Sequence, residues 1–149
     1  MRFGVWGLGF ACVLLAAHLT PPLLLPSPRF SLSFADAGEV YVWGNGGNGR
    51  LGLGSADTVM VPTLLVNHEA HSAPLQFQSV HCGSMHTIGV SRSGAVFTWG
   101  CNGSGQLGHG DRKDLLSPRR VDVLAATPVS QVDAGFDYSA ALTGVSGGW

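Results

Sequence analysis

One glycine-rich stretch has the spacing of a nucleotide-binding loop. Gly44-x-Gly46-x-x-Gly49 follows an apolar run and formally matches the dinucleotide-binding fingerprint. That chemistry needs a helix that begins at the third glycine, because the helix N-terminus holds the pyrophosphate. Instead, Arg50-Leu51-Gly52-Leu53-Gly54 follows, and two more glycines there disfavour a helix. We interpret the match as a turn, and we predict no cofactor.

Four of the six histidines are candidate metal ligands or proton carriers. They are His68, His71, His81 and His86. None stands with cysteines or carboxylates at the spacing of a metal site, and no Ser/His/Asp or Cys/His arrangement has local support. We therefore expect no metal site, no catalytic residue and no enzymatic activity. His86 precedes a Thr-Ile-Gly-Val run, where we expect it to orient a turn by hydrogen bonding.

The charge content argues against a nucleic-acid-binding protein. Charged residues make up 11% of the chain and the formal net charge is -1, so there is no basic footprint for phosphates. The one cationic cluster comprises Arg112, Lys113, Arg119 and Arg120, which we interpret as solvated. We expect no direct contact with nucleic acid.

An internal repeat organises most of the chain. Nine of the seventeen residues from 38 to 54 recur identically 56 positions later, at 94 to 110. A second segment, residues 80–91, recurs at 132–143 with an offset of 52. The four-residue difference between the two offsets falls in the connector that precedes this segment. A period near 50 residues is typical of stacked or radial arrays, in which each unit buries its apolar faces against its neighbours.

Each unit has the signals of short strands. Val40-Tyr41-Val42-Trp43 and Val96-Phe97-Thr98-Trp99 are β-branched and aromatic runs that begin and end at glycine. Alternation places Phe97 with Trp99 on one face, and both faces are largely apolar, as in a strand buried on each side. No segment has a helical period, so we predict an all-β fold built from blades of a β-propeller.

These motifs resemble the regulator of chromosome condensation repeat. The resemblance rests on Gly-x-Val-aromatic-x-Trp-Gly, Gly-Gln-Leu-Gly-x-Gly, a later proline and Gly-x-x-His-Thr, and it covers roughly residues 36–143. It implies an incomplete β-propeller of about two blades with four-stranded antiparallel sheets, because seven such repeats close the ring in that family. We expect the chain to be a fragment that holds one full repeat and most of a second. The residues expected to maintain the blades are Trp43, Gly44, Trp99, Gly100, Leu107 and Gly108.

The resemblance also implies where a partner binds. In the family, loops at one end of the propeller contact partners, and the founding member promotes nucleotide exchange on the small GTPase Ran through acidic and imidazole side chains of the Gly-x-x-His loops. The matching positions here are Ser84, Met85, His86, Phe136 and Asp137. Only Asp137 supplies a carboxylate suited to that exchange chemistry.

The first 35 residues have two competing interpretations. An apolar run with a lone Arg2 and small residues at Ala16-Ala17 suits a secretory signal peptide or a short anchor. A pyrimidine-codon-rich stretch, residues 21–34, equally suits a non-domain segment translated from the region before a splice acceptor. Phe30 to Phe34 nevertheless occupies the place of a strand at offset 56. We expect residues 1–35 to be a leader outside the blades and residues 36–149 to be the partial repeat domain.

Cysteine and sequon patterns leave the compartment open. Three cysteines without paired spacing argue against a disulfide framework, and Cys82 suits a small buried position. Asn102-Gly103-Ser104 is a glycosylation sequon within a turn that the repeat needs, so we expect no glycan there. A leader that is an artefact favours a cytoplasmic or nuclear protein, whereas a genuine one favours a secreted or membrane-anchored protein.

The sequence thus favours a protein-protein interaction scaffold built on the propeller. One alternative is a guanine-nucleotide exchange factor for a Ran-like small GTPase. The other is a secreted or membrane-anchored propeller, which requires a genuine leader. The expected partner is a protein, with a small GTPase as one candidate, and we expect no membrane contact unless the leader is a true anchor.

Overall fold

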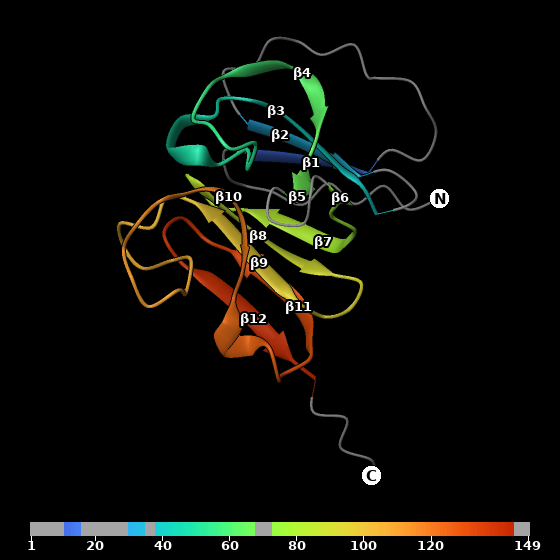
Figure 1. Ribbon diagram of the computed structural model, residues 1–149, viewed down its shortest axis with the longest axis vertical. Helices are drawn as coiled ribbons and strands as arrows, with labels where there is room; N and C mark the ends of the chain where they lie inside the picture. The colour runs from blue at the N-terminus through green and yellow to red at the C-terminus, as the bar shows by residue number, and fades with distance from the viewer. Residues whose placement is uncertain (1–10, 16–29, 35–37, 68–72, 145–149) are drawn as a thin grey trace.

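The computed structural model describes residues 11–15, 30–34, 38–67 and 73–144, and within these ranges it is all-β, as predicted (Figure 1). There is no α-helix in the described ranges, only the 3₁₀ turns η1 (Gly47–Gly49) and η2 (Asp122–Leu124). The strands are β1 (Ala11–Leu15), β2 (Phe30–Phe34), β3 (Val40–Gly44), β4 (Val59–Leu64), β5 (Val66–Asn67), β6 (Ala73–Pro74), β7 (Phe77–Cys82), β8 (His86–Ser91), β9 (Val96–Gly100), β10 (Leu115–Arg120), β11 (Val129–Ala134) and β12 (Ser139–Thr143).

One sheet is a complete blade. Its order is β10-β9-β8-β7, and each neighbouring pair is antiparallel. β8 and β9 lie in the middle of this sheet, and both are largely buried, as expected for strands covered on both faces. The prediction of a four-stranded antiparallel blade is confirmed.

The first sheet reaches further towards the N-terminus than predicted. Its order is β1-β2-β3-β4, and β2 pairs Ser31 with Trp43 as β8 pairs Thr87 with Trp99. The expectation that everything before Asp36 lies outside the blades is therefore wrong for Ala11–Leu15 and Phe30–Phe34, which both belong to this sheet. The segment Phe30–Phe34 alternates apolar and polar residues with a period of two, the pattern of a strand. β1 then adds in parallel, unlike β7 in the complete blade, which is antiparallel to β8.

The rest of the predicted leader, residues 1–10 and 16–29, lies outside the described residues, as do residues 145–149. The interpretation of the leader therefore stays a prediction.

Each repeat contributes to two sheets. The first repeat supplies β3 and β4 to the first sheet and β7 and β8 to the second, while the second repeat supplies β9 and β10 to the second sheet and β11 and β12 to a third. The connector that is longer in the first repeat forms the small β5-β6 pair. In Figure 1 the three sheets follow one another along the long axis in chain order. This interleaving ties neighbouring sheets together through the chain itself.

Positive backbone angles recur at equivalent glycines. Gly44 and Gly100 have φ angles of 102° and 100°, and Gly52 and Gly108 have 75° and 74°. Side chains other than glycine adopt this region at a cost, so the turns after each Trp-Gly depend on these residues. The interpretation of Gly44 to Gly49 as a turn is confirmed, since Gly49 has a φ angle of 76° and residues 47–49 form η1.

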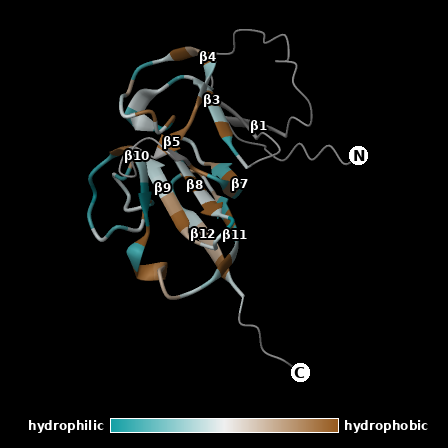
Figure 2. Cartoon of the chain, turned by 45° about the vertical axis from the view of Figure 1, so that its right-hand side comes forward, coloured by the Kyte–Doolittle hydropathy of each residue, from teal (hydrophilic) through white to brown (hydrophobic). Residues whose placement is uncertain are grey.

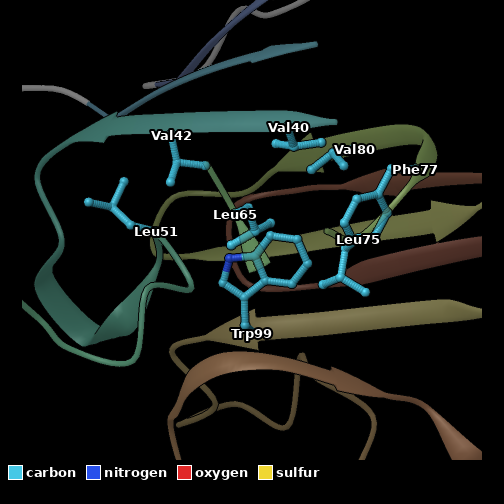
Figure 3. Packing of buried hydrophobic residues seen from close by; sticks show 8 residues of the cluster. All are labelled: Val40, Val42, Leu51, Leu65, Leu75, Phe77, Val80 and Trp99. Atoms are coloured by element: carbon cyan, nitrogen blue, oxygen red, sulfur yellow. The ribbon is translucent and has the colours of Figure 1, made fainter. Parts of the chain in front are cut away.

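A hydrophobic core fills the space between the first two sheets. Trp99 points from β9 towards Leu65, with Val42 and Leu51 beside it (Figure 3). The buried members are Val40, Val42, Leu51, Leu65, Leu75, Phe77, Val80 and Trp99. Phe77 also meets Phe97 edge-on, with ring centroids 5.8 Å apart. The face of β9 that carries Phe97 and Trp99 is thus turned towards the first sheet.

A second core joins the complete blade to the β11-β12 pair. It comprises Ile88, Val90, Val96, Val121, Val129 and Val132. Figure 2 shows hydrophobic segments along β9, β11 and β12, whereas the loop that leaves β9 is mostly hydrophilic. The central blade therefore buries apolar side chains on both faces, as the strand pattern predicts.

The two repeat tryptophans are equivalent in register but not in hydrogen bonding. Trp43 and Trp99 are both buried. Trp99 Nε1 donates to the Arg50 carbonyl at 3.0 Å, whereas Trp43 Nε1 is buried and has no hydrogen-bond partner in the described structure. Thr87 Oγ1 donates to the same Arg50 carbonyl at 3.0 Å, so this one oxygen receives two hydrogen bonds from the second sheet.

Gly52→Ala should destabilise the protein more than Gly108→Ala. A Cβ atom at residue 52 would lie 2.8 Å from Trp99 Nε1 and 3.0 Å from Leu65 Cδ1, whereas at residue 108 its nearest neighbour is Val121 Cγ1 at 3.8 Å. Both substitutions cost about 1–2 kcal/mol for the positive φ, and crowding at residue 52 raises the total to about 2–5 kcal/mol. Urea unfolding of both variants measures the difference. Equal losses would contradict the close packing of Trp99 on the turn.

Candidate functional site

Two equivalent turns stand at the beginning of β8 and β12. The Gly83 amide donates to the His86 carbonyl at 2.8 Å, and the Gly135 amide donates to the Tyr138 carbonyl at 2.9 Å. In each turn the ring of the fourth residue covers the glycine. A Cβ atom at residue 83 would lie 2.3 Å from His86 Cε1, and one at residue 135 would lie 2.1 Å from Tyr138 Cζ. The constraint is stronger at residue 83, where the Cβ atom would also lie 2.6 Å from the Gly135 carbonyl oxygen, than at residue 135, where only the exposed Tyr138 ring would have to move.

The two turns and the loop at Arg50 meet side by side. Ser84 Oγ donates to the Phe136 carbonyl at 2.7 Å, and the Ser84 amide reaches the same oxygen at 3.3 Å. Arg50 Nη1 donates to the Ser84 carbonyl at 3.2 Å. We call the surface formed by residues 47–50, 84–85 and 136–138 the loop face.

The loop face exposes apolar side chains. Met85 is 44% exposed, Phe136 is 66% exposed and Tyr138 is 65% exposed. The Asp137 carboxylate is also at the surface, while Ser84 is half-buried. The structure therefore brings Ser84, Met85, Phe136 and Asp137, which lie on different repeats, into one region. Their role in binding a partner stays a prediction.

His86 lies beneath this surface. It has no exposed area, and its Nε2 atom lies 3.0 Å from Ser139 Oγ, across the boundary between repeats. Its Nδ1 atom is buried and has no hydrogen-bond partner in the described structure. Burial lowers the pKa of His86, and the nearby backbone of Tyr138 and the Asp137 carboxylate oppose this shift. His86 can thus hold the two loops together, but it does not itself face solvent.

Local sequence reasoning missed the pairing of His86 with Ser139. Ser139 lies at the position of Thr87 at offset 52, and Thr87 Oγ1 also bonds to a neighbouring sheet's turn, at the Arg50 carbonyl. That equivalence is the signal that could have indicated a hydrogen bond between repeats. No described carboxylate is hydrogen-bonded to the imidazole, so the pair lacks the third member of a catalytic triad.

The loop after β9 is held by a buried asparagine. Asn102 Nδ2 donates to the carbonyl and to the Oδ1 atom of Asp111, and Asn102 Oδ1 accepts from the Leu107 amide at 3.0 Å. Asp114 links the repeats, because its oxygens accept from the Asn102 amide and from Asn48 Nδ2. The side-chain Nδ2 atom of Asn102, to which a glycan would be attached, is buried and hydrogen-bonded, so the sequon is inaccessible to glycosylation in this fold.

The glycine fingerprint forms a turn, and two of the candidate metal ligands, His68 and His71, lie outside the described residues. Gly44 to Gly49 leads into the three-residue turn η1, so no helix N-terminus is there to hold a pyrophosphate. Among the described residues, no three His, Cys, Asp or Glu side chains gather as metal ligands. Cys82 and Cys101 are both free, and burial raises the pKa of the Cys82 thiol.

Two further sequence questions concern the cationic cluster and a possible membrane-spanning helix. Arg112, Lys113, Arg119 and Arg120 are all exposed, in agreement with a solvated cluster. Within the described part of the chain, no helix is long and apolar enough to cross a membrane.

The sequence profile of the Regulator of chromosome condensation (RCC1) repeat matches residues 37–90 and 93–142, and a second profile of the same repeat matches residues 77–106. Each of the two long matches begins just before the first strand of a repeat and ends in or next to its fourth. The chain belongs to the regulator of chromosome condensation repeat family. The family assignment made from the sequence motifs is confirmed.

Curated relatives carry the repeat within much longer chains. The Ultraviolet-B receptor UVR8 of Arabidopsis thaliana is 40% identical over 106 residues, which is 71% of this chain and 23% of the receptor. The E3 ubiquitin-protein ligase HERC2 of Homo sapiens is 33% identical over 127 residues, which is 85% of this chain and 3% of the ligase. The chain therefore spans less than a quarter of the length of these relatives.

Solved structures share the architecture. Prp20p from Saccharomyces cerevisiae superimposes with a TM-score of 0.68 at 22% identity, covering 84% of this chain and 32% of Prp20p. Human WBSCR16 gives a TM-score of 0.64 at 27% identity, covering 78% of this chain and 30% of WBSCR16. The β-propeller fold, present here in part, is thus shown.

Acidification should weaken the junction between the loops through His86. Its folded-state pKa lies below the ordinary value of 6.5, so the unfolded state binds more protons. The stabilisation from the neutral imidazole is complete above pH 6.5 and is lost as the pH falls through the folded-state pKa. Unfolding free energies measured between about pH 7.5 and pH 5 should decline more steeply for the natural protein than for His86→Gln.

His109 provides the reference for this comparison. Burial lowers its pKa as well, so His86→Gln should retain the smaller pH dependence that His109 contributes. Because His86 is the more deeply buried imidazole, the matched variant His109→Gln should keep most of the dependence of the unfolding free energy on pH. An unchanged slope in His86→Gln would contradict this assignment.

Proposed function

We propose that the chain serves as a protein-interaction scaffold that binds a protein partner through the loop face. The observation that carries this proposal is the pair of exposed apolar side chains, Met85 and Phe136, on loops from different repeats that are fixed to each other by the Ser84 hydroxyl. Loops held by a rigid scaffold are common binding elements, and grouped exposed apolar residues are typical of protein interaction sites.

The relatives support a scaffold role for the repeat itself. One is named as a receptor for ultraviolet-B and another as a ubiquitin ligase, so proteins with different activities carry the same repeat. A shared fold with differing activities is expected when function depends on surfaces added to a common framework. The proposal assigns no catalytic reaction to the chain.

Nucleotide exchange on a Ran-like GTPase is the second candidate. One observation favours it, namely that the Asp137 carboxylate is exposed on the loop face. Prp20p itself is described as having binding properties to Gsp1p and histones, but at 22% identity the likeness supports only the fold for this chain. A secreted or membrane-anchored propeller remains the third candidate, and it depends on the predicted leader.

Substitution of the loop face should abolish partner capture. Phe136→Asp and Met85→Asp each introduce a charge at an exposed apolar position of the loop face, whereas Met60→Asp does so on β4, where Met60 is 68% exposed. Partners are recovered by crosslinking and affinity purification with each chain, and their recovery should fall about tenfold or more for the first two variants. Recovery should be unchanged for Met60→Asp. Partners captured equally by all the chains, or none at all, would overturn the proposal.

The exchange candidate has its own test. We expect no acceleration of GDP release from Ran-like GTPases, because one exposed carboxylate, Asp137, offers little charge to disturb the Mg²⁺ site. Fluorescent GDP release with and without the chain measures this. Acceleration that disappears in Asp137→Ala, with the unfolding midpoint retained, would favour exchange activity over a pure scaffold.

A further inference from the structure

Arg50 occupies a position that a neutral side chain fills in the other repeat. Gly49-Arg50-Leu51-Gly52 corresponds to Gly105-Gln106-Leu107-Gly108 at offset 56. Gln106 is buried, and its Oε1 atom accepts from the Ser104 amide at 2.9 Å within its own turn. Arg50 similarly bonds within its turn, as Nε donates to the Gly47 carbonyl at 2.8 Å. The repeat therefore needs a hydrogen-bonding side chain here, but it does not need a positive charge.

The guanidinium group of Arg50 has no carboxylate partner in the described structure. Its hydrogen bonds go to two neutral carbonyls, those of Gly47 and Ser84. Burial lowers the pKa of Arg50, and the ionisable group that acts in the opposite direction is the Cys101 thiol. The free-energy cost of removing a cation from water is offset best by a hydrogen-bonded group of opposite charge. Arg50 is half-buried without such a group.

One end of the guanidinium group remains open to a ligand. No hydrogen bond joins Nη2 to any described residue. Gly47 lies beside it, and a Cβ atom there would be 3.1 Å from Asn45 Oδ1 and 3.2 Å from Nη2, so a side chain at residue 47 would crowd the guanidinium group. The guanidinium group also lies near the exposed Met85 and Phe136, because Ser84 precedes Met85 and hydrogen-bonds both to Arg50 and to the Phe136 carbonyl.

We infer that Arg50 binds a carboxylate side chain of the protein partner, within an acidic segment whose flanking apolar residues contact Met85 and Phe136. Charge complementarity selects an Asp or Glu, since Nη2 can donate to a carboxylate oxygen in a charge-assisted hydrogen bond. This inference rests on the proposed function and names the chemical class of the partner segment. Arg50 thus supplies specificity, while the apolar residues supply contact area.

The test uses the full chain and fluorescently labelled synthetic peptides. Each 12-residue peptide carries a central Glu or its isostere Gln between Leu and Phe residues, and fluorescence anisotropy measures the Kd. The natural protein should bind the Glu peptides about tenfold or more tightly than the Gln peptides. Arg50→Gln, which installs the residue that the second repeat carries, should remove this preference and retain the unfolding midpoint.

Arg119→Gln is the matched control, because Arg119 is exposed on β10 and its loss changes the net charge equally. This variant should keep the preference for Glu. An equal preference in Arg50→Gln and the natural protein, equal binding of Glu and Gln peptides or no binding of any peptide would each overturn the inference. Equal binding of Glu and Gln peptides by the natural protein overturns the inference even if Arg50→Gln does not fold.

The inference and the proposed function fail in different ways. If peptides bind without regard to charge and Phe136→Asp abolishes that binding, the scaffold proposal stands and the role of Arg50 falls. If no peptide binds but captured proteins still depend on Phe136, the same conclusion holds. Both fall only when neither peptide nor protein binding depends on the loop face.

Discussion

The junction between the first two sheets depends on one backbone oxygen. The Arg50 carbonyl accepts hydrogen bonds from Thr87 Oγ1 and from Trp99 Nε1, each at 3.0 Å. These donors lie on β8 and β9 of the complete blade, whereas Arg50 lies in the turn that follows β3. Because the indole is tied at its polar edge, its ring is fixed in the core between the first two sheets. The packing of Leu51 and Leu65 on Trp99 then follows from that orientation.

The same turn connects the core to the surface. The backbone of Arg50 anchors the buried indole, and its side chain reaches the Ser84 carbonyl on the loop face. Ser84 in turn fixes the loop that carries Phe136. Core packing and loop placement are therefore coupled through contiguous hydrogen bonds. These bonds fix the loops of the loop face to one another, whereas without them each loop would move independently. Binding by such a surface requires less ordering of loops when the partner docks.

The two repeats have the same backbone arrangement of strands and turns, but their side chains differ at particular equivalent positions. Gly46 corresponds to the buried Asn102, Arg50 to Gln106, and His86 to Tyr138. A Cβ atom at residue 46 would meet the Asp57 carbonyl at 1.8 Å, so an asparagine cannot replace this glycine without a shift of the chain. Differences of this kind give each loop its own chemistry while the strands and turns stay the same, as expected for repeat proteins.

The sequence by itself determined the strands, the turns and the family, because these depend on local patterns. Val96 to Gly100 has β-branched and aromatic residues between glycines, and the equivalent glycines adopt the positive φ that such turns need. Contacts across repeats were decided only by the tertiary structure. The pairing of His86 with Ser139 joins residues that are 53 positions apart, and β2 joined the first sheet although its sequence retains little of the repeat. Such outcomes depend on which strand edges and side chains meet in space, and spacing along the chain does not encode them directly.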